Sequence, residues 1–189
     1  MTFPLLFCIA EEAKPFARKA LSTGYFNLAE SRVCPTKRTG LKDDEPLETE
    51  FIGASKEECQ QFSLEKARPP QVNFIEYDII AVVDARSAKD DTLLLQYYAQ
   101  QLDPPYEDPI EYEKFGPLPP KLNVWYDFRI DYKDAFTVIA SLTEGPFETM
   151  HPTYFGLKDE LTDERGIFNV AEAEFLLSGG DLERLGIPK

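Results

Sequence analysis

The residues best placed to do chemistry follow the most apolar segment of the chain. Asp84, Arg86 and Asp91 come after the run Ile79–Val83, and the carboxyl end of a central strand is where open α/β sheets place ligand sites. Carboxylates there predict acid–base chemistry, a divalent cation or a pairing with a basic ligand. In the structural alternative, Asp84 ends the strand, Arg86 neutralises it, and Asp90 and Asp91 solvate a turn.

His151 is the single histidine of the chain and a further candidate acid–base group. With Cys8 or Cys34 it would form a nucleophile and base if folding brought the side chains together, because imidazole activates a thiolate. Neither cysteine carries a family signature, so a turn at His151 and Pro152 is the alternative. Together with Cys59 the cysteines form an odd, widely spaced set, which predicts neither a disulfide framework nor a zinc site.

Sequence signatures of cofactor binding are missing. The chain has no dinucleotide-binding G-x-G-x-x-G, no phosphate-binding P-loop, no G-x-S-x-G and no H-E-x-x-H, and the carboxylates at 159–164 lack the spacing of a calcium loop. We therefore expect no cofactor and assign no metal ligands. Whether the protein is an enzyme stays open at this point.

Aromatic residues gather in the middle of the chain and predict a recognition surface. The candidate binding residues are Tyr106, Tyr112, Phe115, Trp125 and Tyr126. Tyrosine and tryptophan bury a large area at low entropic cost, although core packing is the alternative explanation. The first three lie in a proline-rich, acidic segment at 103–120, which we expect to be a long surface loop outside any sheet.

The overall charge restricts the classes of partner. The formal net charge is −14, with a pI near 4.5, and such a field repels nucleic acids and anionic membranes. The negative charge favours a basic protein or a cationic small molecule as a partner. In the alternative interpretation, the acidic residues only keep the surface well solvated. No apolar run approaches 20 residues and no signal-peptide pattern is present, so we expect a cytoplasmic protein without a membrane segment.

Two functions follow from these features, and a third remains open. The first is a soluble acidic binding or inhibitor-like protein that recognises a basic protein or cationic ligand. The alternative is a small accessory metabolic enzyme, with an aromatic pocket and the carboxylates after the central strand as acid, base or ligand. A homodimer or a subunit of a larger assembly is the third, because exposed aromatics also form subunit interfaces.

The spacing of apolar residues predicts the strands and helices that must position these residues. The segment 74–84 is expected to be the central strand, because its β-branched second half needs burial on both faces. Further strands are expected at 3–9, near 25–33, at 92–98, at 123–130 and at 166–170. Pro4 places the first of these at an edge or delays its start.

Helical periodicity and caps predict the remaining elements. Ser55 and Glu58 have the spacing of a capping box and predict a helix at 56–66. Other helices are expected at 11–21, 131–142 and 171–177, with irregular structure at 145–165. The pattern predicts one α+β domain over residues 1–189, in which a mixed sheet of four to six strands packs against three to four helices.

Three stretches of the later half carry a resemblance to a known family: Ala81–Ser87 with Asp91–Leu95, Phe128–Ala135 and Asp163–Phe168. They resemble a domain-of-unknown-function family of small bacterial and fungal proteins. The resemblance covers roughly residues 72–170. It implies no known activity, and none of the three stretches is a catalytic signature.

Overall fold

The computed structural model describes residues 2–68, 72–101 and 110–186. Over these residues it has a five-stranded mixed sheet, a two-stranded sheet and six α-helices, which confirms the predicted α+β class. The chain divides into two compact units. The first consists of Met1–Tyr97 with Trp125–Ala135, and the second of Tyr98–Val124 with Phe136–Lys189. That the whole chain folds as one domain stays a prediction.

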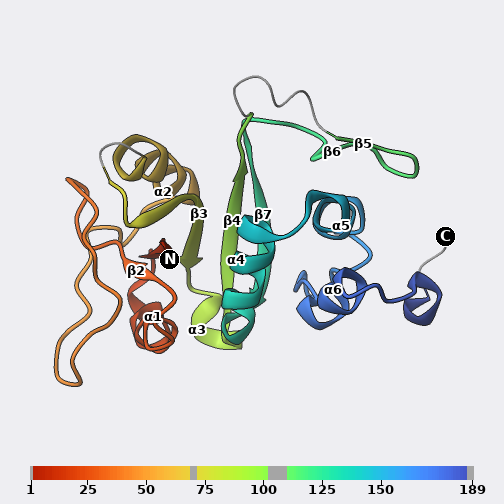
Figure 1. The fold of residues 1–189 in the computed structure, drawn as a ribbon. Helices are drawn as coiled ribbons and strands as arrows, with labels where there is room; N and C mark the ends of the chain where they lie inside the picture. The colour runs from red at the N-terminus through yellow and green to blue at the C-terminus, as the bar shows by residue number, and fades with distance from the viewer. Residues whose placement is uncertain (1, 69–71, 102–109, 187–189) are drawn as a thin grey trace. The chain divides into compact units, whose positions relative to one another are not determined.

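The larger sheet has the strand order β2-β1-β3-β4-β7 (Figure 1). Its strands are β1 (Phe3–Cys8), β2 (Asn27–Leu28), β3 (Ile75–Val83), β4 (Thr92–Ala99) and β7 (Val124–Asp131). β1 is parallel to both β2 and β3, whereas β4 is antiparallel to β3. The central position predicted for β3 is therefore confirmed.

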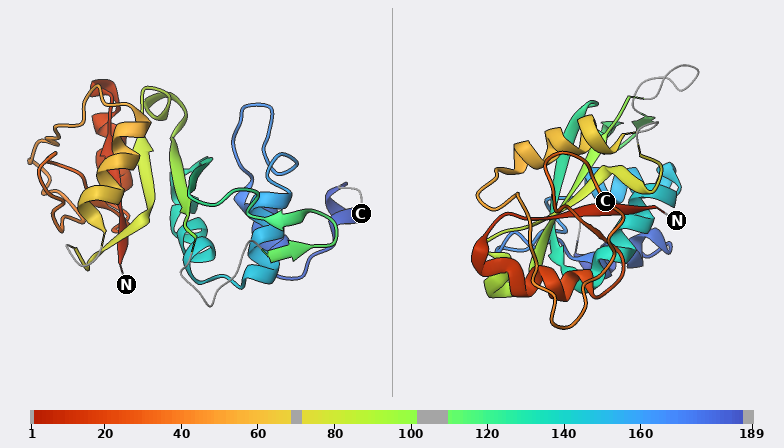
Figure 2. Two further views of the ribbon diagram at one scale, coloured as in Figure 1. Left: turned by 90° about the horizontal axis from the view of Figure 1, so that it is seen from above. Right: turned by 90° about the vertical axis from the view of Figure 1, so that its left-hand side faces the viewer.

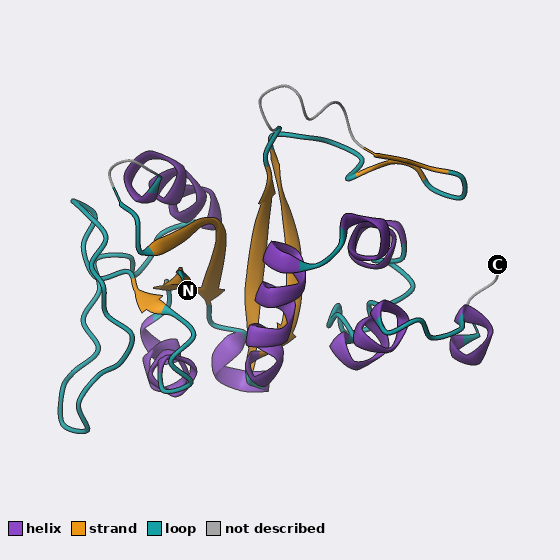
Figure 3. Ribbon diagram, viewed as in Figure 1, coloured by secondary structure: helices purple, strands orange, loops and turns teal. Residues whose placement is uncertain are grey.

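Two expectations about the first strands need correction. β1 lies between two strands and not at an edge, and the register with β3 shifts between Pro4 and Leu5. Such an irregularity accommodates a proline, which cannot donate to the ladder. The strand expected near 25–33 is reduced to the two residues of β2. Beyond it the chain runs as a long loop up to α2 (Figure 3), with Arg38 paired to both Glu30 and Glu45.

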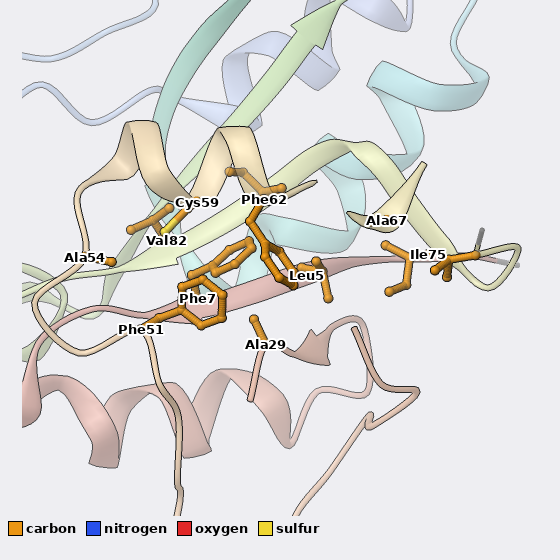
Figure 4. Close-up of a cluster of buried hydrophobic side chains, with 12 residues drawn as sticks. Leu5, Phe7, Ala29, Phe51, Ala54, Cys59, Phe62, Ala67, Ile75 and Val82 are labelled. Carbon is orange, nitrogen blue, oxygen red and sulfur yellow. The ribbon is translucent and has the colours of Figure 1, made fainter. Parts of the chain in front are cut away.

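Helices α1 (Lys14–Leu21) and α2 (Lys56–Phe62) lie on opposite faces of the sheet beside β1 (Figures 1 and 4). Both were predicted. A 3-10 turn at Glu11–Ala13 leads into α1, and a π-helical turn at Ser63–Ala67 continues α2. The predicted capping box is present, since Ser55 Oγ accepts from Glu58 N at 3.2 Å while Ser55 N donates to Glu58 Oε2 at 2.7 Å.

The core between α2 and the sheet is built on three phenylalanines (Figure 4). Phe7 of β1 meets Phe51 and Phe62 with ring centroids 4.8 and 5.9 Å apart, and Phe51 and Phe62 are 5.1 Å apart. All three pairs are edge to face, the arrangement that aromatic quadrupoles favour. Cys59 is fully buried in the same cluster, which agrees with a packing role.

The second unit combines a short hairpin with helices. The hairpin is formed by β5 (Ile110–Tyr112) and β6 (Gly116–Leu118), and the helices are α4 (Ala135–Glu144), α5 (Phe147–His151) and α6 (Val170–Leu177). Asp131 caps the turn that leads into α4, as predicted, by accepting from Lys133 N at 2.9 Å. No helix in the described part of the chain is long and apolar enough to cross a membrane.

Three expectations for the second unit are wrong. Residues 110–112 and 116–118 form strands, although their prolines predicted a loop. The segment 145–165 contains α5 and a π-helical turn at Pro152–Gly156. Pro146 and Pro152 precede or open these helical turns, where proline's missing N–H costs nothing. In place of a strand at 166–170 there is a single bridge between Thr162 and Phe168.

The capping box predicts a measurable contribution to stability. Ser55→Ala removes the acceptor for the Glu58 amide and is expected to lower the free energy of unfolding by about 1 kcal/mol. Urea unfolding followed by circular dichroism measures the change. Thr39→Ala, at an exposed loop position, is the control and is expected to stay within about 0.5 kcal/mol of the parent. Equal effects of both substitutions would contradict the role of the cap.

Candidate functional site

The carboxyl ends of β1 and β3 lie side by side at a topological switch point of the sheet. From β1 the chain passes through α1 to β2 on one side, and later passes through α2 to β3 on the other side of β1. Ile9 N donates to Val83 O at 2.9 Å, so the two strand ends adjoin. Open α/β sheets bind ligands at such a point. Asp84 follows it directly, in the position predicted for it.

Asp84 is held by a dense set of hydrogen bonds. Arg129 on β7 donates from Nη1 to Oδ1 at 3.1 Å and from Nη2 to Oδ2 at 2.5 Å, and Ser87 donates to Oδ1 from its amide at 2.9 Å. Burial alone would raise the pKa of Asp84, but the bonds from Arg129 and Ser87 outweigh it and hold that pKa below its usual range. The carboxylate is therefore ionised and already paired.

The other charged residues after β3 form separate pairs. Arg86 Nε donates to Asp90 Oδ2 at 2.8 Å. The structural alternative expected Arg86 to neutralise Asp84, but the cation paired with Asp84 is Arg129. Asp91, in a left-handed conformation with φ of 57°, pairs with Lys19 at 2.6 Å. Within the described ranges no group of three carboxylate, cysteine or histidine side chains is arranged to hold a metal ion.

His151 belongs to the second unit and is 8% exposed. It lies at the end of α5, so the turn predicted at this position is wrong. Its ring contacts Phe147 at a centroid distance of 5.0 Å, Phe155 at 5.4 Å and Tyr112 at 6.3 Å. Burial lowers the pKa of His151, although a hydrogen bond to the Leu118 backbone partly opposes the shift. The imidazole is therefore held in its neutral form.

The cysteines considered as partners of His151 belong to the first unit. Cys8 is buried, and burial raises the pKa of its thiol to about 11, which leaves almost no thiolate at neutral pH. Cys34 is exposed. A nucleophile-and-base pair of Cys34 with His151 stays a prediction.

The structure divides the five aromatic binding candidates. Tyr112 and Phe115 belong to the second unit, in and beside the hairpin. Trp125 and Tyr126 lie on β7 in the first unit, where Trp125 packs against the core that contains Phe7. Tyr106 lies outside the described residues. These aromatics do not all line a single surface of one unit.

Two features of the structure were missed in the sequence. Phe147 and Phe155 flank His151 at intervals of four residues, a helical spacing that would have revealed the aromatic cluster. Glu76 and Asp78 are two acidic residues inside a buried strand. Burial, followed by the hydrogen bond and the charge of Glu76, raises the pKa of Asp78 to about 8.

Comparison with known proteins gives no relative from which function could be transferred. No protein-family model, no curated protein and no solved structure matches the chain. The resemblance over residues 72–170 therefore stays a prediction.

Substitution of the two candidate aspartates is expected to lower stability by very different amounts. Asp84→Asn leaves the Arg129 guanidinium, whose side chain is 10% exposed, without its counter-charge. We expect a loss of about 2–3 kcal/mol in the free energy of unfolding. Asp91→Asn removes an exposed pair with Lys19 and is expected to leave the free energy of unfolding nearly unchanged. Chemical denaturation of both variants checks this, and similar values for the two would refute the difference.

The carboxyl groups of Glu76 and Asp78 on β3 predict a pH-dependent stability. The pKa of Asp78 rises from 3.8 to about 8 on folding, so between these values the folded state holds a proton that the unfolded state has lost. Stability therefore falls as pH rises through this window. Asp78→Asn removes that loss of stability. We therefore expect the difference in melting temperature, variant minus parent, to become more positive as the pH rises from about 5 to about 8.5.

Thermal melts at several pH values measure this difference. Asp43→Asn, at an exposed position, serves as the control, and its difference from the parent is expected to stay constant with pH. A constant difference for Asp78→Asn as well would show that this carboxyl group does not take up a proton on folding.

Proposed function

We propose that the protein is a non-enzymatic binding or inhibitor-like protein that recognises a basic protein or a cationic ligand through the second unit. The contact region is termed the hairpin surface and is defined by Ile110, Glu111, Tyr112, Glu113, Phe147 and Glu148. The observation that carries the proposal is the combination of exposed apolar side chains with exposed carboxylates on two elements that are tied together.

Apolar exposure supports a contact role for this surface. Ile110 is 40% exposed and Phe147 is 45% exposed. Aromatic and large apolar side chains that stay accessible in a polar surrounding are typical of protein interaction sites. Tyr112, whose recognition role was predicted from the sequence, lies on the same strand as Ile110.

The hairpin and α5 are held together, which gives the surface a defined shape. Tyr112 Oη donates to the Phe147 carbonyl at 2.7 Å. A Cβ atom at Gly156 would come within 2.9 Å of the Phe115 ring, so only glycine permits this close approach. Figure 2 lets the reader follow the hairpin across α5. A rigid surface loses less entropy on binding than a flexible loop would.

The charge of the second unit suits a basic partner. It contains 15 of the 34 acidic residues but only 6 of the 20 basic ones. Glu111, Glu113 and Glu148 are exposed. Such a distribution accelerates the association of a cationic partner and disfavours a homodimer through the same surface, because like charges would face each other.

The enzyme hypothesis has less support. Asp84, Asp90 and Asp91 each pair with a separate cation in the first unit, so these carboxylates serve the fold. We place the protein in the cytoplasm, in keeping with three cysteines that are all unpaired.

A synthetic amphipathic peptide of alternating lysine and leucine pairs tests the proposal. We expect it to bind the full-length protein, and Phe147→Ser to weaken binding about fivefold or more, because the substitution removes an exposed apolar contact without changing charge. Isothermal titration calorimetry at two salt concentrations measures the dissociation constants.

Matched variants separate the hairpin surface from general charge attraction. Val33→Ser alters a large apolar residue of the first unit that is 77% exposed, and Glu57→Gln removes an exposed first-unit carboxylate. Neither substitution is expected to change binding. Glu148→Gln is expected to weaken it. If Phe147→Ser and Val33→Ser bound the peptide equally well, the proposed surface would be wrong.

A further inference from the structure

We propose that His151 and the aromatic rings around it form a binding site for an ammonium or guanidinium group, donated by a lysine or arginine side chain of the basic partner. The identity of the partner rests on the proposed function. The site itself lies within the second unit and is testable with small cations alone.

The starting observation is an unsatisfied acceptor. His151 is only 8% exposed. Its Nδ1 atom is buried and nevertheless has no hydrogen-bond partner. The imidazole interacts with the Leu118 backbone, and because Nδ1 has no partner we assign this interaction to Nε2. That bond raises the pKa of the imidazole, as donation to a carbonyl oxygen does. With this assignment the proton of the neutral ring is on Nε2, and Nδ1 carries a lone pair.

A buried acceptor without a donor is rare in folded proteins, because its desolvation is not compensated. A ligand that brings an N–H group to Nδ1 would remove this penalty. The group must be a donor, since burial keeps the imidazole neutral and Nε2 already uses the ring proton. This excludes a ligand that offers only acceptor oxygens, such as a carboxylate.

The surroundings of Nδ1 favour a donor that also carries positive charge. Phe147, Phe155 and Tyr112 contact the imidazole with centroid distances between 5.0 and 6.3 Å, and aromatic faces attract ammonium and guanidinium groups. The carboxylate of Glu148 also acts on His151, where its charge raises the pKa. An acceptor, three rings and an anion together match a cation with N–H groups.

Phe147 controls the approach to this site. Its ring is 5.0 Å from the imidazole at an angle of 36°, while the residue is 45% exposed. It is thus both a cover over His151 and part of the hairpin surface. A partner that contacts Phe147 would displace its ring and bring a cationic side chain to Nδ1.

The single histidine makes the test direct, because its imidazole nitrogen signals need no assignment among residues of the same type. We titrate the full-length ¹⁵N-labelled protein with n-butylammonium and record the imidazole resonances. The expected result is a saturable upfield shift of Nδ1 that n-butyltrimethylammonium does not produce, since that cation has the same charge but no N–H donor. Equal effects of both cations, or no effect, would overturn the site.

A variant links the site to partner binding. His151→Gln retains a side-chain N–H for the Leu118 backbone but lacks an acceptor equivalent to Nδ1. We expect it to bind the lysine–leucine peptide about five- to tenfold more weakly than the parent, with an unchanged circular dichroism spectrum. Phe155→Leu, which keeps the acceptor and removes one ring, is expected to weaken binding less and serves if His151→Gln does not fold.

The outcomes distinguish the two proposals. If the peptide binds through Phe147 but His151→Gln binds equally well, the hairpin surface stands and the cation site at His151 is wrong. If n-butylammonium shifts the Nδ1 resonance while Phe147→Ser leaves the dissociation constant of the peptide unchanged, the cation site stands and the proposed partner surface is wrong.

Discussion

Burial of β3 on both faces is the constraint on which the first unit depends. Ile79–Val83 are buried throughout, and β1 and β4 pair with them on either side. A strand covered on both faces must end where polar groups find partners, because an unpaired buried charge is costly. Asp84 meets this need through Arg129 and Ser87. The same interactions explain why the most suggestive carboxylate of the sequence serves to complete the fold.

This division of roles locates the candidate functional surface elsewhere. In the first unit the carboxylates after β3 are neutralised one by one by Arg129, Arg86 and Lys19. The second unit has a large excess of carboxylates and presents Ile110 and Phe147 to solvent. Apolar side chains set among exposed carboxylates gain free energy from a partner that is both basic and apolar, and neither property alone would use the whole surface.

Much of the first unit could be predicted from the sequence because its signals are local. The β-branched run of β3 and the capping box of Ser55 each define an element within a dozen residues. The partner of Asp84 could not be predicted, since Arg129 lies 45 residues away and only the sheet order brings the two together. Asp84 itself was placed correctly because strand ends are visible in the sequence.

The second unit was harder to predict because its prolines have more than one meaning. Pro117 lies within β6 of a two-stranded hairpin, where an unpaired edge tolerates a missing N–H, and Pro152 opens a helical turn. Interpreted as breakers, these residues hid α5 and with it the cluster of Phe147, His151 and Phe155. Burial keeps the imidazole neutral beside the single carboxylate of Glu148, and in our proposal a bound cation pairs with its free nitrogen, so the cluster has a chemical use that the paired Asp84 lacks.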